Sequence, residues 1–457
     1  MRSASHDTVL PPGLRWSAAT SAIQIEGSPS DDGGGRSIWD DFVDVPGAVR
    51  DHSTPHRACD SYRHPDADVA LVADLGIDRY RFSIPWARVQ PDGRGPGSTA
   101  ALDHYSRFID ALLEVGVTPF PTLYHWEMPS AVEAEGGWLV RETAARFADY
   151  AAIVADRLGD RVTRWYTLNE PAMTTLQGYG SGALAPARPL LFQALPTVHF
   201  QLLAHASAAE ALRSRGATAV GLVNNHTRVL PLTASSDDLV AATAYDTLHN
   251  RLFSEPLLAG AYPDLDVFGL PPMPVLDGEL ARIAGSIDFY GINFYSPTTI
   301  TAADPEGPLP FTIVPTPGAP VTGFGEEWPI VPGALRDLLV DLHHRHPHMP
   351  PVIVGENGAS FPEPDDAVRV DDAERIDYLA DHITAVSEAM AAGVPVEEYT
   401  VWSLLDNWEW ADGFTQRFGL VHVDFATGER TPKASYVWYR DAIARTRTAA
   451  AIERTVR

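Results

Sequence analysis

Short apolar runs alternate with helix-like segments along almost the whole chain. Eight of these runs have the length and composition of buried strands, and they cover residues 16–25, 79–84, 118–124, 162–168, 219–223, 287–294, 351–354 and 399–405. The segments between them include residues 100–115, 141–158, 192–215 and 372–392, which are predicted to be helices. Gly393 is expected to cap the last of these helices.

This alternation predicts an α/β fold, namely a closed (β/α)8 TIM barrel of parallel strands. The strands of such a barrel are covered on both faces and therefore appear as continuous apolar runs. Stretches rich in proline and glycine, above all residues 302–325, are expected to form long βα loops over the barrel. Because neither an internal repeat nor a change of composition marks a second unit, residues 1–457 are predicted to form one domain.

Size and composition agree with this interpretation. Length alone would indicate about three domains, but a barrel with long loops holds a single core at 457 residues. The one cysteine, Cys59, excludes an intramolecular disulfide and a multi-cysteine metal site, and it favours a reducing compartment. Residues 1–10 lack the apolar core of a secretory signal, and no run is long enough to span a membrane. A cytoplasmic protein without a membrane partner is predicted.

Charge and histidine content narrow the partners further. The formal net charge of −26 argues against nucleic acid, whose phosphates would be repelled, and it leaves a neutral small molecule and a homo-oligomer open. The histidine-rich run at residues 343–348 raises a metal hypothesis, but its place after a helix-like stretch favours a solvated helix end. Residues 31–35 are rich in glycine without the strand-to-helix context of a phosphate loop. No metal and no cofactor are predicted.

Two carboxylate motifs carry the strongest chemical signal. Residues 165–171 (WYTLNEP) and 352–358 (VIVGENG) are apolar runs that end in a glutamate, Glu170 or Glu356, followed by a turn-forming residue. Either motif alone is more typical of a closing turn. Two strand ends that each deliver a carboxylate to one cleft, however, are what glycoside hydrolysis by a pair of carboxylates requires.

Other polar and aromatic residues also follow the predicted strands, at the end of a barrel where active sites form. They are Gln24 at the first strand, Arg81 in the second, His125 and Trp126 after the third, Asn169 at the fourth, Asn293 and Tyr295 at the sixth, and Trp402, Glu409 and Trp410 at and after the eighth. Taken alone, each of these residues is more typical of a structural role, either packed in the core or hydrogen-bonded in the interior. Their joint placement favours a site.

These motifs resemble those of the family 1 glycoside hydrolases of the β-glucosidase type, over nearly the whole chain. The similar stretches, in the family's order, are residues 16–27, 37–40, 80–83, 123–126, 168–171, 288–295, 356–358, 402–407, 417–420 and 430–433. The chain departs from the family at Gly355, where threonine is usual. No departure removes a catalytic group.

The resemblance implies a retaining mechanism. Glu356 is expected to be the nucleophile that forms a glycosyl-enzyme, and Glu170 the general acid and base, with their carboxyl groups about 5–5.5 Å apart. Arg81 is expected to favour the charged form of Glu356, which Tyr295 also contacts. Asn169 and Asn293 are expected to support the pair.

The resemblance also implies a binding site for a terminal non-reducing β-D-glucosyl residue. Its expected sugar-binding residues are Gln24, His125, Trp126, Trp402, Glu409, Trp410 and Phe418, and Asn224 and Trp328 are expected on the aglycone side. A carboxylate at Glu409 would repel a sugar 6-phosphate, so an unphosphorylated small-molecule β-glycoside is predicted as the substrate.

Three alternatives stay open at this point. The same groups would tolerate epimeric sugars, which gives β-galactosidase or β-fucosidase activity. The loops could favour transfer to an acceptor sugar over transfer to water. A catalytically inactive glycan-binding barrel is the alternative from a different class, since one fold hosts many functions, but the presence of both Glu170 and Glu356 argues against it.

Overall fold

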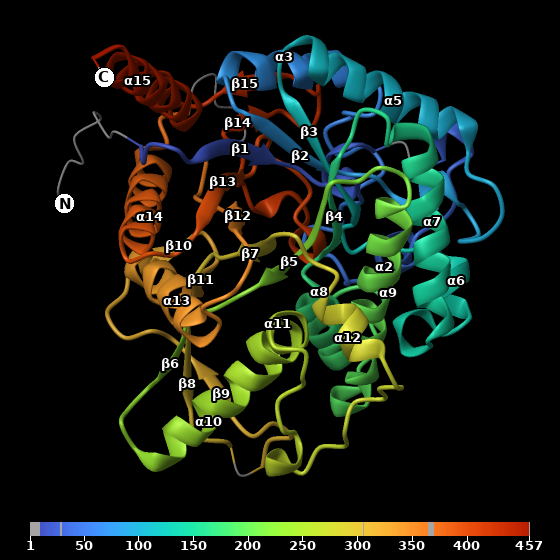
Figure 1. The fold of residues 1–457 in the computed structure, drawn as a ribbon, viewed down its shortest axis with the longest axis vertical. Coiled ribbons are helices and arrows are strands. Elements are labelled where there is room, and N and C mark those ends of the chain that lie inside the picture. Colours follow the sequence, from blue (N-terminus) through green and yellow to red (C-terminus); the bar gives the residue numbers. More distant parts are fainter. Residues whose placement is uncertain (1–9, 28–29, 305, 364–369, 457) are drawn as a thin grey trace.

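The computed structural model describes residues 10–27, 30–304, 306–363 and 370–456, with the backbone alone from residue 450. Eight parallel strands close into a barrel and follow one another around it in chain order (Figure 1). They are β1 (Arg15–Ala19), β2 (Arg79–Ser83), β3 (Thr118–Tyr124), β4 (Arg164–Asn169), β5 (Ala219–Asn225), β7 (Tyr290–Asn293), β12 (Val352–Asn357) and β13 (Val396–Trp402). The predicted (β/α)8 barrel is therefore confirmed.

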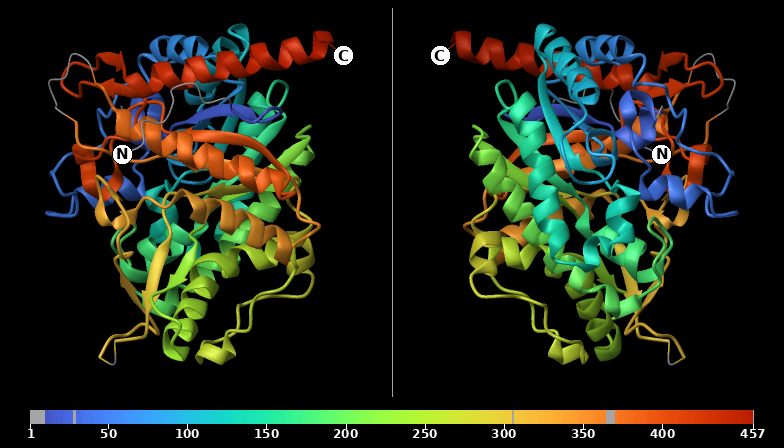
Figure 2. Two further views of the ribbon diagram at one scale, coloured as in Figure 1. Left: turned by 90° about the vertical axis from the view of Figure 1, so that its left-hand side faces the viewer. Right: turned by 90° about the vertical axis from the view of Figure 1, so that its right-hand side faces the viewer.

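Helices cover the outside of the barrel (Figures 1 and 2). The longer ones are α3 (Pro65–Leu75), α5 (Thr99–Glu114), α7 (Glu142–Leu158), α9 (Pro196–Arg213), α10 (Ser236–Asp246), α13 (Pro332–Arg345), α14 (Ala373–Ala391) and α15 (Ala434–Val456). The shorter ones are α1 (Ala22–Ile25), α2 (Ile38–Val43), α4 (Trp86–Val89), α6 (Ser130–Ala134), α8 (Pro171–Met173), α11 (Leu252–Leu258) and α12 (Glu279–Ala284).

The connections contain further short elements. The 3₁₀ and π turns are η1 (Asp31–Gly33), η2 (Gly137–Leu139), η3 (Thr174–Ser181), η4 (Leu191–Ala194), η5 (Thr247–Arg251), η6 (Asp266–Phe268) and η7 (Trp410–Thr415). Three small sheets lie outside the barrel and consist of β6 (Val229–Pro231), β8 (Thr298–Thr301) and β9 (Thr312–Val314), of β10 (Val321–Thr322) and β11 (Gly325–Pro329), and of β14 (Val421–Val423) and β15 (Arg430–Pro432).

Local sequence signals explain where the helices begin and end. The Ser98 hydroxyl accepts a hydrogen bond from the Ala101 amide and so caps α5. This helix buries one apolar stripe, made of Ala101, Leu102, Tyr105, Ile109 and Leu112. At the end of α14, Gly393 has a φ of +98° and follows the capping residue Ala392, which places the predicted glycine stop one residue after the cap.

Several predicted boundaries shift in the structure, and three of them change the local secondary structure most. The first strand ends at Ala19, and the residues up to Ile25 turn into helix α1. Residues 302–325 contain β9 and β10 and the first residue of β11, so this stretch is not one open loop. The helix predicted over 192–215 begins at Pro196, after the separate turn η4.

Apolar side chains pack in two layers. The main core fills the space between the barrel and its helices. A separate cluster from the barrel strands and the segment before β7 contains Phe120, Tyr166, Val223, Phe289 and Ile353. In it the Phe120 and Tyr166 rings stack with centroids 4.4 Å apart and an interplanar angle of 13°. This cluster supports the residues at the carboxyl ends of the strands.

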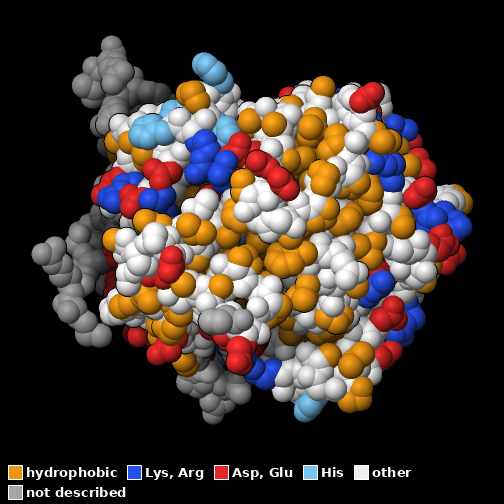
Figure 3. Space-filling model, turned by 90° about the horizontal axis from the view of Figure 1, so that it is seen from below, with side chains coloured by type: hydrophobic (Ala, Val, Ile, Leu, Met, Phe, Trp, Pro, Cys, Tyr) orange, Lys and Arg blue, Asp and Glu red, His pale blue; other side chains and the backbone are white. Residues whose placement is uncertain are grey.

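The surface mixes side chains of all kinds. Figure 3 shows acidic and basic groups scattered over one face, with apolar side chains between them. Exposed large apolar residues such as Val240, Val267 and Leu276 come from separate segments, which is normal for a protein surface. Within the described ranges, no helix has the length and apolar character needed to cross a membrane.

Candidate active site

Two buried glutamates lie at the carboxyl ends of barrel strands. Glu170 directly follows β4, Glu356 is the next-to-last residue of β12, and each is only 3% exposed. In a parallel barrel these strand ends meet at one mouth. A continuous chain of hydrogen bonds through Arg81, Asn169 and Asn293 joins the two carboxyl groups.

Glu356 is held by a cation and a phenol. The Arg81 guanidinium donates to Glu356 Oε1 at 2.6 Å, and the Tyr295 hydroxyl donates to Oε2 at 2.5 Å. Burial raises the pKa of Glu356, while the Arg81 charge and the Tyr295 hydrogen bond act in the opposite direction. The expected pairing of Arg81 with this carboxylate is present, and it favours the charged form against the effect of burial.

Glu170 has amide partners instead of a cation. The side-chain amides of Asn293 and Asn225 donate to its Oε1 at 2.6 Å and 3.1 Å. Burial, and then repulsion by the Glu356 charge, raise the pKa of Glu170 to about 8. Its φ of +48° is rare outside glycine, and such backbone conformations concentrate at functional sites.

One asparagine links the two carboxylates. Asn169 Oδ1 accepts from Arg81 Nη2 at 2.7 Å and from Asn293 Nδ2 at 3.1 Å. The Asn169 amide also donates to His125 Nε2 at 3.0 Å, which places the neutral-ring proton of His125 on Nδ1. Burial lowers the pKa of His125 well below its usual range, so the ring is uncharged at neutral pH.

Aromatic side chains line the same mouth. The His125 ring is nearly parallel to Trp402 and to Trp410, with centroids 5.7 Å and 6.0 Å away. The ring centroids of Trp126 and Trp410 lie 4.6 Å apart. Both residues have positive φ values, at turns of the chain after the third and eighth barrel strands. Phe418 packs with Trp402 in a small apolar cluster.

Gln24 and Glu409 meet although they are far apart in the sequence. Gln24 Nε2 donates to Glu409 Oε2 at 3.0 Å and to Asn407 Oδ1 at 2.9 Å, and Gln24 Oε1 accepts from Ser21 at 2.7 Å. Gln24 lies on α1 and not at the end of the first strand as predicted. The short helix follows β1 directly, so the side chain still reaches the partner residues of the eighth strand's loop.

The structure separates the two residues expected on the aglycone side. Trp328 packs against Tyr295 and Phe324, at centroid distances of 4.9 Å and 4.5 Å. Asn224 is not brought to the site, because its amide donates to the Tyr290 hydroxyl at 2.7 Å and the residue is fully buried.

Asn225 is the residue of this strand that reaches Glu170, and the sequence analysis missed it. Successive residues of a strand point to opposite faces, so a shift of one position exchanges a residue in the site for one outside it. The signal available was its place at the carboxyl end of β5.

Known proteins resemble this chain over almost its full length. The model of glycosyl hydrolase family 1 matches residues 6–448. The chain belongs to glycosyl hydrolase family 1. Beta-glucosidase A of Thermotoga maritima is 40% identical over 441 residues, which are 95% of this chain and 97% of that protein. The family resemblance found in the sequence is thereby confirmed, and the protein is a glycoside hydrolase.

One further relative and one solved structure are also similar to this family 1 hydrolase. The bifunctional beta-D-glucosidase/beta-D-fucosidase of Bifidobacterium breve is 40% identical over 462 residues, covering 95% of this chain and 98% of the relative. The structure of the Thermotoga maritima beta-glucosidase in complex with glucoimidazole superposes with a TM-score of 0.90 at 38% identity, covering 96% of this chain and 99% of that one.

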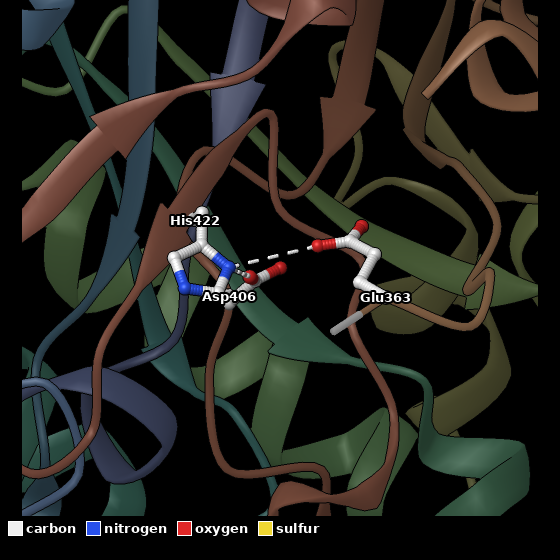
Figure 4. Close-up of side chains that lie close together, drawn as sticks. All are labelled: Glu363, Asp406 and His422. Carbon is white, nitrogen blue, oxygen red and sulfur yellow. Dashed lines mark ion pairs between the residues drawn. The ribbon is translucent and has the colours of Figure 1, made fainter. Parts of the chain in front are cut away.

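A second cluster of charged residues lies behind the segment that carries Glu409. Among the described residues, Glu363, Asp406 and His422 are the group whose ligand atoms come close enough to hold a metal ion (Figure 4). Cationic side chains already engage Glu363 Oε1 and both carboxylate oxygens of Asp406, whereas Glu363 Oε2 has no hydrogen-bond partner among the described residues. Lys433 Nζ lies 2.6 Å from Glu363 Oε1 and 2.8 Å from Asp406 Oδ1, and Arg417 lies 3.1 Å from Asp406 Oδ2. Arg375 also contacts Glu363. These contacts make the group an ion cluster, which is a network of buried ion pairs between the segment before β14, the residue after β15 and the segment that carries Glu363.

The histidine-rich run at residues 343–348 lies elsewhere. The run is predicted to form the solvated end of a helix. Helix α13 does end at Arg345, within the run, and His344 is exposed. His346 is buried, which the prediction of a solvated end did not include.

The ion cluster yields a prediction about stability. Lys433→Met is expected to lower the free energy of unfolding by about 3–5 kcal/mol, because it leaves two buried carboxylates short of a cation. Arg94→Met is the matched control, since the Arg94 ion pair is exposed and should change stability by less than about 1 kcal/mol. Urea unfolding measures the stability of both variants. Equal unfolding midpoints for the two would contradict the stabilising role of Lys433 in the ion cluster.

Proposed function

We propose that this protein is a retaining exo-β-glycosidase that hydrolyses the terminal β-D-glucosyl residue of small β-glucosides. Glu356 serves as the nucleophile and Glu170 as the acid and base. The observation that supports these roles is the contrast in their partners. Glu356 is bonded to the Arg81 cation, whereas Glu170 is bonded to two neutral amides.

This contrast fits the two roles chemically. At neutral pH the proton belongs on Glu170, whose pKa is raised to about 8, so Glu170 can protonate the leaving oxygen. Attack by Glu356 then forms an ester and removes its negative charge. Loss of that charge lowers the pKa of Glu170, which allows the same residue to deprotonate the incoming water.

The neighbouring groups suit a sugar in the site. Gln24 and Glu409 together offer a donor and acceptors to adjacent hydroxyls, and the Nδ1 proton of His125 offers another donor. Trp402 presents an apolar face for the carbon–hydrogen face of the ring. Asn169 is suited to bond the 2-hydroxyl, an interaction that strengthens in the transition state.

The substrate class follows from Glu409 and from the relatives. Relatives named as a beta-glucosidase and as a bifunctional beta-D-glucosidase/beta-D-fucosidase favour an unphosphorylated glucoside or fucoside. Burial and the neighbouring acids raise the pKa of Glu409 well above its ordinary value, and a 6-phosphate beside its ionised form would meet a like charge, which costs several kcal/mol in a closed site. The single buried cysteine, Cys59, supports a cytoplasmic location.

A substrate panel tests this proposal. The purified protein is expected to hydrolyse 4-nitrophenyl β-glucoside and β-fucoside, and to act on the 6-phosphoglucoside at least about 100-fold more slowly in kcat/KM. Glu409→Gln should reduce that discrimination, because it removes the charge and keeps the size. Failure to hydrolyse any of these glycosides by the folded protein would refute the proposed function.

A further inference from the structure

Gly355, the residue before Glu356, lies at an unusually tight place in β12. A Cβ atom on Gly355 would lie 2.8 Å from Val223 Cγ2, 2.9 Å from Asn293 Oδ1 and 3.5 Å from the Tyr166 hydroxyl. Contacts below about 3 Å force a neighbour to move. The glycine therefore allows the side chains of Val223, Asn293 and Tyr166 to converge on one point behind the nucleophile.

Two of these converging atoms are buried polar atoms. The Tyr166 hydroxyl and Asn293 Oδ1 make no hydrogen bond to the part of the protein that the structure describes. A buried polar group without a partner costs about 1–3 kcal/mol, so native structures rarely leave two of them facing one position. A phenol donates and an amide oxygen accepts, so these two groups are complementary.

The other end of the Asn293 amide contacts the proposed acid and base. Asn293 Nδ2 donates to Glu170 Oε1 at 2.6 Å and to Asn169 Oδ1 at 3.1 Å. The orientation of the amide plane therefore decides whether Glu170 keeps its shorter hydrogen bond. A partner for Asn293 Oδ1 would hold this plane from the opposite side.

Tyr166 is well placed to be that partner. Its ring stacks on Phe120, with centroids 4.4 Å apart, and the Arg81 guanidinium carbon lies 5.0 Å from its ring centre. The residue is 1% exposed, and burial raises the pKa of its hydroxyl above the ordinary value, so the hydroxyl keeps its proton. These two contacts hold the ring in place, so the hydroxyl points along a defined direction.

We propose that Tyr166 is a positioning residue for the Asn293 amide and, through it, for Glu170. Its hydroxyl makes no direct hydrogen bond to Asn293 Oδ1 in the structure, and it reaches that atom through one water along the path that Gly355 leaves open. This inference rests on the proposed function of Glu170. A crystal structure of the protein is expected to show this water, which would satisfy both atoms.

Tyr166→Phe removes the hydroxyl and keeps the ring. Without its anchor, the Asn293 amide donates less to the charged form of Glu170, so the pKa of Glu170 rises. The alkaline limb of kcat/KM on an aryl β-glucoside is expected to move up by about half a pH unit, and kcat to fall about threefold to tenfold. A purely structural effect would lower the active fraction and leave the position of the limb unchanged.

Two substitutions at Gly355 provide a matched pair. Gly355→Ala and Gly355→Ser impose the same Cβ contacts on Val223 and Asn293, but only serine brings a hydroxyl that can donate to Asn293 Oδ1. In the Tyr166→Phe background, serine is expected to return the alkaline limb to the wild-type position, and alanine is not. If Tyr166→Phe does not fold, the same comparison is made in the wild-type background, where alanine alone should displace the limb.

The outcomes separate this inference from the proposed function. If the wild-type protein hydrolyses aryl β-glucosides while Tyr166→Phe keeps the wild-type limb and kcat, the positioning role of Tyr166 is wrong and the glycosidase function stands. Equal pH profiles for the serine and alanine variants likewise overturn the positioning role. If the wild-type protein hydrolyses no glycoside, both proposals fall.

Discussion

Replacing Glu356 with glycine is expected to lower hydrolysis of an aryl β-glucoside by a factor on the order of 10⁴ or more, because it removes the atom that attacks the anomeric carbon. Arg81 and Tyr295 lose the carboxylate that both of them contact, but the other residues of the sugar site are unchanged. Azide should partly restore turnover by entering the space of the lost side chain. It would attack from the side of the missing carboxylate, displace the aryl oxide and give the glucosyl azide of inverted configuration, which NMR identifies.

Glu398 provides the matched control for this substitution. It is also a fully buried barrel glutamate paired with an arginine, Arg79, but it sits near the start of β13, at the opposite end of the barrel from Glu356. Glu398→Gly is expected to destabilise the fold, and azide should have no effect on its activity. A Glu356→Gly variant that keeps a tenth of the wild-type activity, or that forms no sugar azide, would show that Glu356 is not the nucleophile.

Sequence patterns predicted the barrel and the two glutamates because both depend on local signals. Each strand is an apolar run, and a parallel barrel necessarily brings the carboxyl ends of its strands together. Two residues were misassigned because they were placed by counting along a strand, although the Gln24 side chain does reach Glu409. Gln24 lies on a helix, and Asn224 lies one position from Asn225, which contacts Glu170.

Contacts between distant segments could not be predicted in this way. Lys433 joins Glu363 and Asp406, and nothing in the local pattern of any of the three residues indicates this pairing. The same holds for Tyr166 and Gly355, whose meeting depends on which side chains two strands turn toward the barrel interior. Sequence patterns identify residues that carry chemistry more readily than those that hold them in place.

Replacing Glu170 with alanine should affect substrates according to their leaving groups. A glucoside with a poor leaving group needs a proton in the first step, so its kcat/KM at pH 7 is expected to fall about 10²- to 10⁴-fold. A 2,4-dinitrophenyl glucoside leaves as a stable anion and should lose less than about tenfold in the same constant. A similar loss for both substrates would contradict the assignment of Glu170 as the acid.

The pH profile of the same variant gives an independent measurement. The pKa of Glu170 is raised to about 8, so in the wild-type protein the acid is present below that pH and kcat/KM should decline as the pH rises through it. This alkaline limb should disappear in Glu170→Ala. Burial also raises the pKa of Glu127 to about 8, but its carboxylate accepts from the Trp86 and Ala87 amides at the start of α4. Glu127→Gln should therefore keep the alkaline limb. If the limb disappears in Glu127→Gln, the group that titrates is Glu127 and not Glu170.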